Sequence, residues 1–331
     1  MARLGRRDFM RGLTAATAVG LAGVNVRPAG AEPPPETTRI RIAKVPAICL
    51  APMYVAEEML RSEGFTDVQY VEMDLPQIAN SVAEGATDLS AETAPDLVMK
   101  LDSGRPLVVV AGLHVGCYEL FGGDRVQRIR DLMGKRVVVA DPGRRAFISS
   151  MAAQVGLDPK DIQWVETSGE EAMQLFVEGK VDAYLGFPPE PQELRAKRIG
   201  HVVVNTSKDR PWSQYFCCMA FSSREFVRRN PVAVKRALRA ILKADKICVT
   251  APDRAARNIV DRGFTSSYDY ALQTMSDVPF GRWSEYDPAD TMRFYALRLH
   301  EAKMIKSNPQ KILGQGTDWR FINEVKKELK G

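Results

Sequence analysis

Residues 136–145 read RVVVADPGRR, a short run of β-branched residues followed at once by Asp-Pro-Gly. The run from Arg136 to Ala140 predicts a buried strand, and the residues after it predict a tight turn. Because proline is favoured in the first turn of a helix, we expect a helix from Arg144 past Met151. This strand–turn–helix unit is typical of a layered α/β fold.

The same alternation of apolar runs and helical patterns recurs on both sides of this unit, which favours parallel sheets. Beyond residue 230 the pattern is mainly helical: Val234, Leu238 and Ile241 lie on one face of an expected helix that Asn230 would cap. Further strands are expected at residues 40–45, 68–71, 88–91, 107–111, 162–165, 181–185 and 202–204.

Two segments, residues 116–122 and 213–221, separate these blocks of alternating elements. We expect both segments to cross between two lobes, forming a hinge beside a cleft that can close on a ligand. Lobe one is predicted to comprise residues 39–117 plus 217–331, and lobe two residues 118–216. The expected fold class is therefore a two-lobe α/β protein with two hinge crossings.

The first 31 residues have the composition of an export signal. Paired arginines at Arg6 and Arg7 precede an uncharged stretch and then small residues that end at Ala31. A basic start, an apolar middle and a small-residue exit are typical of a secretory signal. The paired arginines resemble the twin-arginine (Tat) signal, so the Tat translocase is an expected partner. We expect cleavage after Ala31, a flexible lead-in at residues 32–38, and a soluble periplasmic product.

Charge gives no support for a nucleic-acid partner. The chain has a formal net charge of +5, but the signal segment holds five arginines and one aspartate, which account for four of those charges. The remainder is nearly neutral, whereas nucleic-acid binders carry a basic surface. No later stretch approaches the roughly 20 apolar residues of a membrane span.

Metal, cofactor and catalytic signatures are missing from the sequence. The cysteines show no Cys-x-x-Cys spacing and the three histidines are scattered, so no metal site and no cofactor are predicted. Buried thiols are the favoured reading of the cysteines. No nucleophile elbow, His-Glu-x-x-His pair or phosphate-binding loop is present, which argues against an enzyme. The five cysteines are Cys49, Cys117, Cys217, Cys218 and Cys248.

The loop at residues 141–145 is the most pointed candidate for ligand binding. Ligands of parallel α/β sheets bind beyond the carboxyl ends of the strands. A helix start offers free backbone N–H groups there, and Arg144 or Arg145 could add forked donors to an anion. The alternative is a surface turn whose arginines are solvated or paired with Asp141.

Other loops contribute further candidates. Glu92 and Glu190 could face each other across the cleft and bind a ligand amine, or could simply be solvated. His114 has a structural alternative, and Tyr118 and Trp212 could pack on a ligand or in the core. The complete set of expected ligand-binding residues is Pro52, Tyr54, Glu92, Thr93, His114, Gly143, Arg144, Arg145, Phe187 and Glu190.

Four motifs carry a resemblance to a known family. They are APMYVAE at residues 51–57, GATDL at 85–89, LMGKRVVV at 132–139, and EGKVDA at 178–183, which leads into Pro-Pro-Glu-Pro. Over residues 40–311 the chain resembles periplasmic substrate-binding proteins of ABC transporters, in the group that binds nitrate, sulfonates, taurine and thiamine-pyrimidine precursors.

The resemblance implies two lobes that close on a small molecule and deliver it to a membrane permease. Many relatives have a Gly-Ser/Thr-rich turn where this chain has Gly143-Arg144-Arg145, and the added positive charge favours an anionic solute. Two alternatives stay open. One is a pyrimidine-precursor binder or a related synthase-like enzyme. Such synthases have a cysteine-rich run near the active site, which Cys217-Cys218-Met219 resembles only weakly. The other is the ligand-binding subunit of a sensor.

Overall fold

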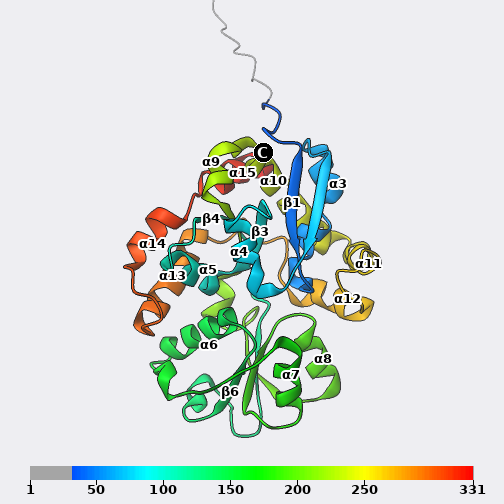
Figure 1. The fold of residues 1–331 in the computed structure, drawn as a ribbon. Coiled ribbons are helices and arrows are strands. Elements are labelled where there is room, and N and C mark those ends of the chain that lie inside the picture. The colour runs from blue at the N-terminus through cyan, green and yellow to red at the C-terminus, as the bar shows by residue number, and fades with distance from the viewer. Residues whose placement is uncertain (1–31, 331) are drawn as a thin grey trace, which may run out of the picture. The chain divides into compact units, whose positions relative to one another are not determined.

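Two five-stranded sheets organise residues 32–330, which are the residues that the computed structural model describes. Each sheet forms the centre of one lobe, as Figure 1 shows. The strand orders are β2-β1-β3-β10-β4 and β7-β6-β8-β5-β9. The expected two-lobe α/β architecture is confirmed, whereas the expected export signal lies outside the described residues.

The strands are short and mostly buried. The first sheet consists of β1 (Arg39–Lys44), β2 (Asp67–Glu72), β3 (Leu89–Thr93), β4 (Leu107–Val115) and β10 (Phe216–Ser223). The second sheet consists of β5 (Glu119–Gly122), β6 (Arg136–Val139), β7 (Gln163–Glu166), β8 (Ala183–Gly186) and β9 (His201–Asn205).

Both sheets are mixed, so the expected parallel pairing holds for only part of each sheet. Strands β1, β2 and β3 pair in parallel, as do β6, β7 and β8. In contrast, β10 runs antiparallel to β3 and β4, and β5 runs antiparallel to β8 and β9. The physical reason is the crossing between lobes, because a strand that arrives from the other lobe enters its sheet in the opposite direction.

Helices cover both sheets. The first lobe carries α2 (Ala51–Tyr54), α3 (Glu57–Ser62), α4 (Ile78–Ala83), α5 (Ala94–Asp102), α9 (Arg224–Arg229), α10 (Pro231–Thr250), α11 (Pro252–Asp261), α12 (Tyr268–Asp277), α13 (Pro288–Glu301), α14 (Pro309–Gly316) and α15 (Arg320–Lys330). The second lobe carries α6 (Pro142–Gln154), α7 (Gly169–Val177) and α8 (Glu190–Lys197). Among the described residues, no helix is both long and apolar enough to cross a membrane.

Helix α10 shows how the sequence pattern determines packing. The residues predicted on its apolar face, among them Val234, Leu238 and Ile241, are fully buried. The expected cap Asn230 makes no side-chain bond to the helix start. Instead the Glu36 carboxylate accepts hydrogen bonds from the backbone N–H groups of Val232 and Ala233 at 3.0 and 2.9 Å. The lead-in, which was expected to be flexible, is therefore anchored at this residue.

The two crossings run side by side between the lobes. The first joins β4 to β5 through residues 116–118, and the second joins β9 to β10 through residues 206–215. The Thr206 hydroxyl links them, because it accepts from the Cys117 N–H at 3.1 Å and donates to the Tyr118 carbonyl at 2.8 Å. We propose that lobe one comprises residues 39–117 plus 217–331, and lobe two residues 118–216.

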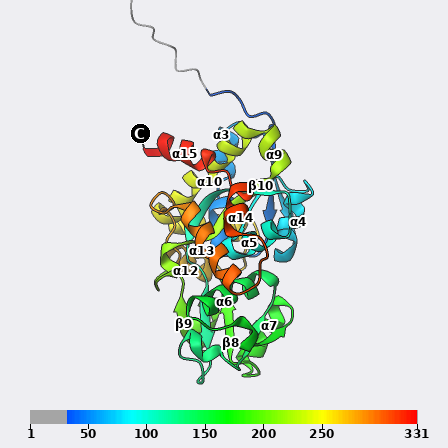
Figure 2. The ribbon, with the colours of Figure 1, turned by 90° about the vertical axis from the view of Figure 1, so that its left-hand side faces the viewer.

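The lobes also meet through helices. Helix α6 lies next to α5 and α13 in both views (Figures 1 and 2). Phe147 of α6 packs against Tyr295 of α13 with ring centroids 5.5 Å apart. Both rings are fully buried or nearly so, so this contact excludes water from one side of the lobe interface.

Replacing Gly116 by alanine should destabilise the protein by about 2–3 kcal/mol, because two costs add. Gly116 has a φ of +57°, and a Cβ there would lie 2.3 Å from the Cα of Ser207 in the other crossing. Chemical denaturation would measure the loss. Gly134→Ala is the matched control, since its φ is +67° but a Cβ added there would meet no atom within 4 Å. Equal losses in the two variants would contradict the steric argument.

Candidate functional site

A cavity of about 50 Å³ lies between the lobes, where the carboxyl ends of β3 and β6 face each other. Its position agrees with the general rule for α/β sheets. The lining consists of Ala47, Cys49, Leu50, Leu75, Pro76, Ala91, Glu92, Thr93, Asp96, Lys100, Tyr118, Asp141, Pro142, Gly143, Phe187 and Cys218.

The first lobe contributes an acidic wall. Strand β3 ends at Thr93, whose hydroxyl caps helix α5 by accepting from the backbone N–H of Asp96 at 3.4 Å. Pro95 occupies the first turn of the helix, where its missing N–H costs nothing. This strand–helix junction holds Glu92 and Asp96 side by side at the cavity.

Glu92 and Asp96 form a buried carboxyl pair, since the two residues are 9% and 6% exposed. Burial raises the pKa of Glu92 well above its usual range, and the negative charge of Asp96 raises it further. The pKa of Asp96 is raised as well, mainly by burial. Among the described residues, Glu92 Oε2 is buried and has no hydrogen-bond partner. Burial therefore favours the protonated form of the pair, and one polar oxygen at the cavity is left for a ligand.

The second lobe contributes the Asp141 loop and an aromatic surface. Asp141 caps helix α6 by accepting from the backbone N–H of Arg144 at 2.8 Å. A Cβ on Gly143 would lie 3.2 Å from the Cβ of Asp96, so the two lobes touch here. Tyr118 and Phe187, with ring centroids 5.6 Å apart, close another side of the cavity.

Arg144 does not line the cavity, although its loop does. The guanidinium lies behind the wall and is 3% exposed. It donates to Asp141 Oδ2 at 3.0 Å, to both oxygens of Glu190 at 3.0 and 2.8 Å, and to Tyr184 and the Leu185 carbonyl. Its donors are committed to these protein acceptors, so it has little left to offer a solute anion.

Arg145 points to a different surface. Its side chain is 39% exposed, pairs with Glu166 and lies over the Trp164 ring at 5.1 Å. The expectation that one of these two arginines contacts a bound anion therefore lacks the geometry it needs.

The other expected residues divide into two groups. Glu92, Thr93, Gly143 and Phe187 line the cavity. Glu190 pairs with Arg144 instead of facing Glu92. Pro52 and Tyr54 are buried away from the cavity, and the Tyr54 hydroxyl donates to the Val45 carbonyl at 2.9 Å. His114 was expected in a loop but belongs to strand β4.

Several lining residues were missed by the sequence reasoning. Asp96 carries a usable signal, since it is an acid in the first turn of a helix that follows a strand. Lys100 follows one turn later on the same helix. Cys49 and Cys218 line the cavity from separate segments, and no local pattern marks them. With His114 and Cys117 they also form a group of potential metal ligands.

The family description NMT1/THI5 like matches residues 49–255. The chain belongs to this family. Among relatives of the NMT1/THI5 like chain is a 4-amino-5-hydroxymethyl-2-methylpyrimidine phosphate synthase of Saccharomyces cerevisiae. It is 22% identical over 231 residues, which cover 63% of this chain and 67% of the synthase.

Solved structures show that the fold of this NMT1/THI5 like protein is that of periplasmic binding proteins. The periplasmic nitrate-binding protein of Synechocystis PCC 6803 superimposes with a TM-score of 0.75 at 14% identity, over 90% of each chain. The alkanesulfonate-binding protein of Xanthomonas axonopodis pv. citri gives a TM-score of 0.68 at 16% identity, over 82% of this chain and 96% of its own. The resemblance in fold predicted from the motifs is confirmed.

Proposed function

We propose that the protein is the exported solute-binding component of an ABC importer, which captures a small molecule by lobe closure and delivers it to a membrane permease. The observation that supports this role is the cavity itself, because its polar lining comes from both lobes. Glu92 and Asp96 belong to the first lobe, and Asp141 and Gly143 to the second. A solute that touches both lobes favours the closed state by its differential affinity for that state.

Closure and release require contacts that can break. The cavity volume of about 50 Å³ is far below that of typical small-molecule pockets, so a solute enters only when the lobes part. Among the described residues, opening must break a limited set of polar contacts. Ile48 N–H donates to the Pro188 carbonyl at 3.3 Å, Gln192 donates to Asp277 at 3.0 Å, and Arg298 donates to Gln154 at 3.1 Å. Asp277 also forms an ion pair with Arg195, so opening must separate one pair of partly exposed charges.

The solute is proposed to carry positive charge or to gain it on binding. The cavity is lined by Glu92, Asp96 and Asp141 against one cation, Lys100, and Asp141 already serves Arg144. A buried carboxyl pair that retains a proton stabilises an amine or a basic ring nitrogen. The charge argument for an anion depended on Arg144 and Arg145, neither of which lines the cavity. We therefore favour a cationic or proton-accepting solute over an anion.

An aminopyrimidine fits this site chemically. The yeast relatives are named as synthases of an aminopyrimidine phosphate. Such a ring offers an exocyclic amine and an adjacent ring nitrogen, which together match the two oxygens of one carboxyl group. On binding, the proton shared by Glu92 and Asp96 would move to the ring nitrogen and leave both carboxylates against a cationic ring. Tyr118 and Phe187 would contact the ring through their aromatic surfaces.

Calorimetry with matched compounds would test this proposal. We expect 4-aminopyrimidine to bind and 4-methylpyrimidine to bind at least about 10-fold more weakly, because the methyl group cannot donate to a carboxylate. The ¹⁵N chemical shift of the ring nitrogen should report its protonation in the complex. Binding of nitrate or ethanesulfonate, without binding of the aminopyrimidine, would contradict the proposed solute class.

A synthase-like enzyme is a second candidate, because the yeast relatives carry that name over about two thirds of their length. The two roles differ in what happens to the solute. A binding protein returns the compound unchanged after the complex is unfolded, which NMR of the released material would establish. Recovery of a chemically altered compound would favour the enzyme.

A further inference from the structure

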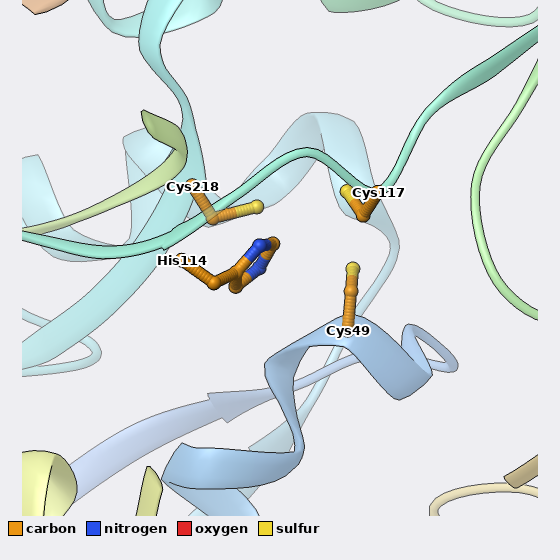
Figure 3. A group of neighbouring side chains, drawn as sticks. All are labelled: Cys49, His114, Cys117 and Cys218. Carbon is orange, nitrogen blue, oxygen red and sulfur yellow. The ribbon is translucent and has the colours of Figure 1, made fainter. Parts of the chain in front are cut away.

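Four buried side chains from separate segments lie close to one another, as Figure 3 shows, and two of them belong to the cavity lining. Cys49 lies in the turn Ile48–Leu50 before α2, His114 near the end of β4, Cys117 in the first crossing, and Cys218 on β10. One potential ligand atom from each lies within 4.8 Å of all the others. None of these residues is more than 4% exposed.

The two ring nitrogens of His114 differ in their hydrogen bonding. Nδ1 lies 2.9 Å from the Gly116 carbonyl oxygen, so this nitrogen carries the proton and donates it. Among the residues that the structure describes, Nε2 is buried without a hydrogen-bond partner. A metal-ligating histidine is typically held in this way, with the far nitrogen bonded to a carbonyl and the near lone pair directed at the ion. An unpartnered buried acceptor is otherwise costly and rare.

The spacing of the four atoms suits a tetrahedral ion after a small contraction. Zinc bonds of about 2.3 Å to sulfur and 2.0 Å to nitrogen place neighbouring ligand atoms roughly 3.5–3.8 Å apart. The observed limit of 4.8 Å exceeds this by about 1 Å, which side-chain rotation can close. Three thiols and one imidazole are the ligand types that select zinc-like ions over magnesium or calcium.

We propose that Cys49, His114, Cys117 and Cys218 form a Cys₃His site for a tetrahedral, thiophilic divalent cation of the zinc type. The three thiols lose their protons when the ion binds. Cys217 supports the site, because its sulfur lies 3.1 Å from that of Cys117 and its S–H can donate to the bound thiolate.

The site would connect the hinge to the cavity. Cys117 belongs to the first crossing. Cys218 is the third residue of β10, the strand that follows the second crossing. Cys49 and Cys218 also line the solute cavity. A bound ion would hold both crossings against the first lobe and form part of the cavity floor. With four protein ligands the coordination is closed, as in structural zinc sites.

A competing arrangement shares one of these thiols. Cys117 and Cys217 are close enough that an added oxidant could join them, with loss of two protons and two electrons to that oxidant. A disulfide between them would remove a metal ligand. The two arrangements therefore exclude each other.

Titration of the fully reduced full chain with Co²⁺ would test the proposal without any organic solute present. We expect one Co²⁺ per chain, with sulfur-to-cobalt charge-transfer bands and the visible bands of a tetrahedral ion, followed by displacement with one equivalent of Zn²⁺. Cys218→Ser and His114→Ala should lose the stoichiometric uptake. Cys248→Ser is the matched control, because that thiol is equally buried but lies outside the group on α10.

Two results would overturn the site: no stoichiometric uptake by the reduced unaltered chain, or unchanged bands in the Cys218 variant. If a variant at one of the four metal ligands fails to fold, the unaltered chain still provides a test. One equivalent of Zn²⁺ should then protect three of its thiols from alkylation, and no added protection would contradict the site. Uptake of metal is measured independently of aminopyrimidine binding, so failure of one proposal leaves the other standing.

Discussion

Replacing Asp96 by asparagine should weaken binding of a cationic or aminopyrimidine solute by about 100-fold, on the order of 3 kcal/mol. Asp96 is 6% exposed and lines the cavity at the start of α5, so a lost ionic contact there is not screened by water. Calorimetry at neutral pH would measure the change. The variant keeps the shape of the side chain, and its solute-free stability should not fall, because a buried negative charge beside Glu92 is removed.

Glu92→Gln provides the matched comparison and a pH signature. Folding raises the pKa of Glu92, so its contribution to stability is complete below the unfolded pKa near 4.5 and decreases as pH rises above that value. The groups that act on Glu92 are Asp96, Lys100 and Asp141. The glutamine variant lacks this titration and should be more stable than the unaltered chain at neutral pH.

The two acid variants together separate function from folding. Weaker solute binding with equal or greater stability is the result expected of residues that serve a ligand at the expense of the fold. If Asp96→Asn and Glu92→Gln bound the solute as tightly as the unaltered chain, the carboxyl pair would have no role in recognition. Denaturation curves at acidic and neutral pH would complete the comparison.

Local patterns predicted much of the fold because each βα unit is encoded within about 20 residues. The run at residues 136–139 forms β6, and Asp141-Pro142-Gly143 leads into α6 as expected. The direction of each strand in its sheet was harder to predict from the sequence. The antiparallel pairing of β10 depends on where the chain returns from the second lobe, which no local pattern contains.

Long-range pairing explains why the contacts at the site differ from those expected. The loop position of Arg144 suits an anion, but its partners Tyr184 and Glu190 lie 40 and 46 residues away in the sequence. The cysteines were judged by spacing along the chain, whereas Cys117 and Cys217 approach each other across 100 residues. Residue type and loop position therefore indicated where the cavity lies, whereas the side chains that line it depend on long-range pairing.

Replacing Arg144 by methionine should destabilise the protein by about 3–5 kcal/mol, because removal of the buried guanidinium leaves two partly buried carboxylates without their cation. Arg144 joins the N-terminal ends of two helices, since Asp141 caps α6 and Glu190 is the first residue of α8. Its guanidinium also lies 4.6 Å from the Phe187 ring centroid, directly behind the cavity wall. The variant should therefore lose stability and bind solute more weakly through displacement of Phe187 and Asp141.

Arg145→Met is the matched control for this experiment, because the neighbouring arginine is 39% exposed and pairs with an exposed glutamate. An exposed pair contributes about 0–1 kcal/mol, so this variant should be nearly as stable as the unaltered chain. The double variant Arg144→Met with Glu190→Gln should recover part of the loss, since it removes one of the unpaired charges. Equal denaturation midpoints for the two single arginine variants would contradict the structural role of Arg144 and reopen its assignment to the solute.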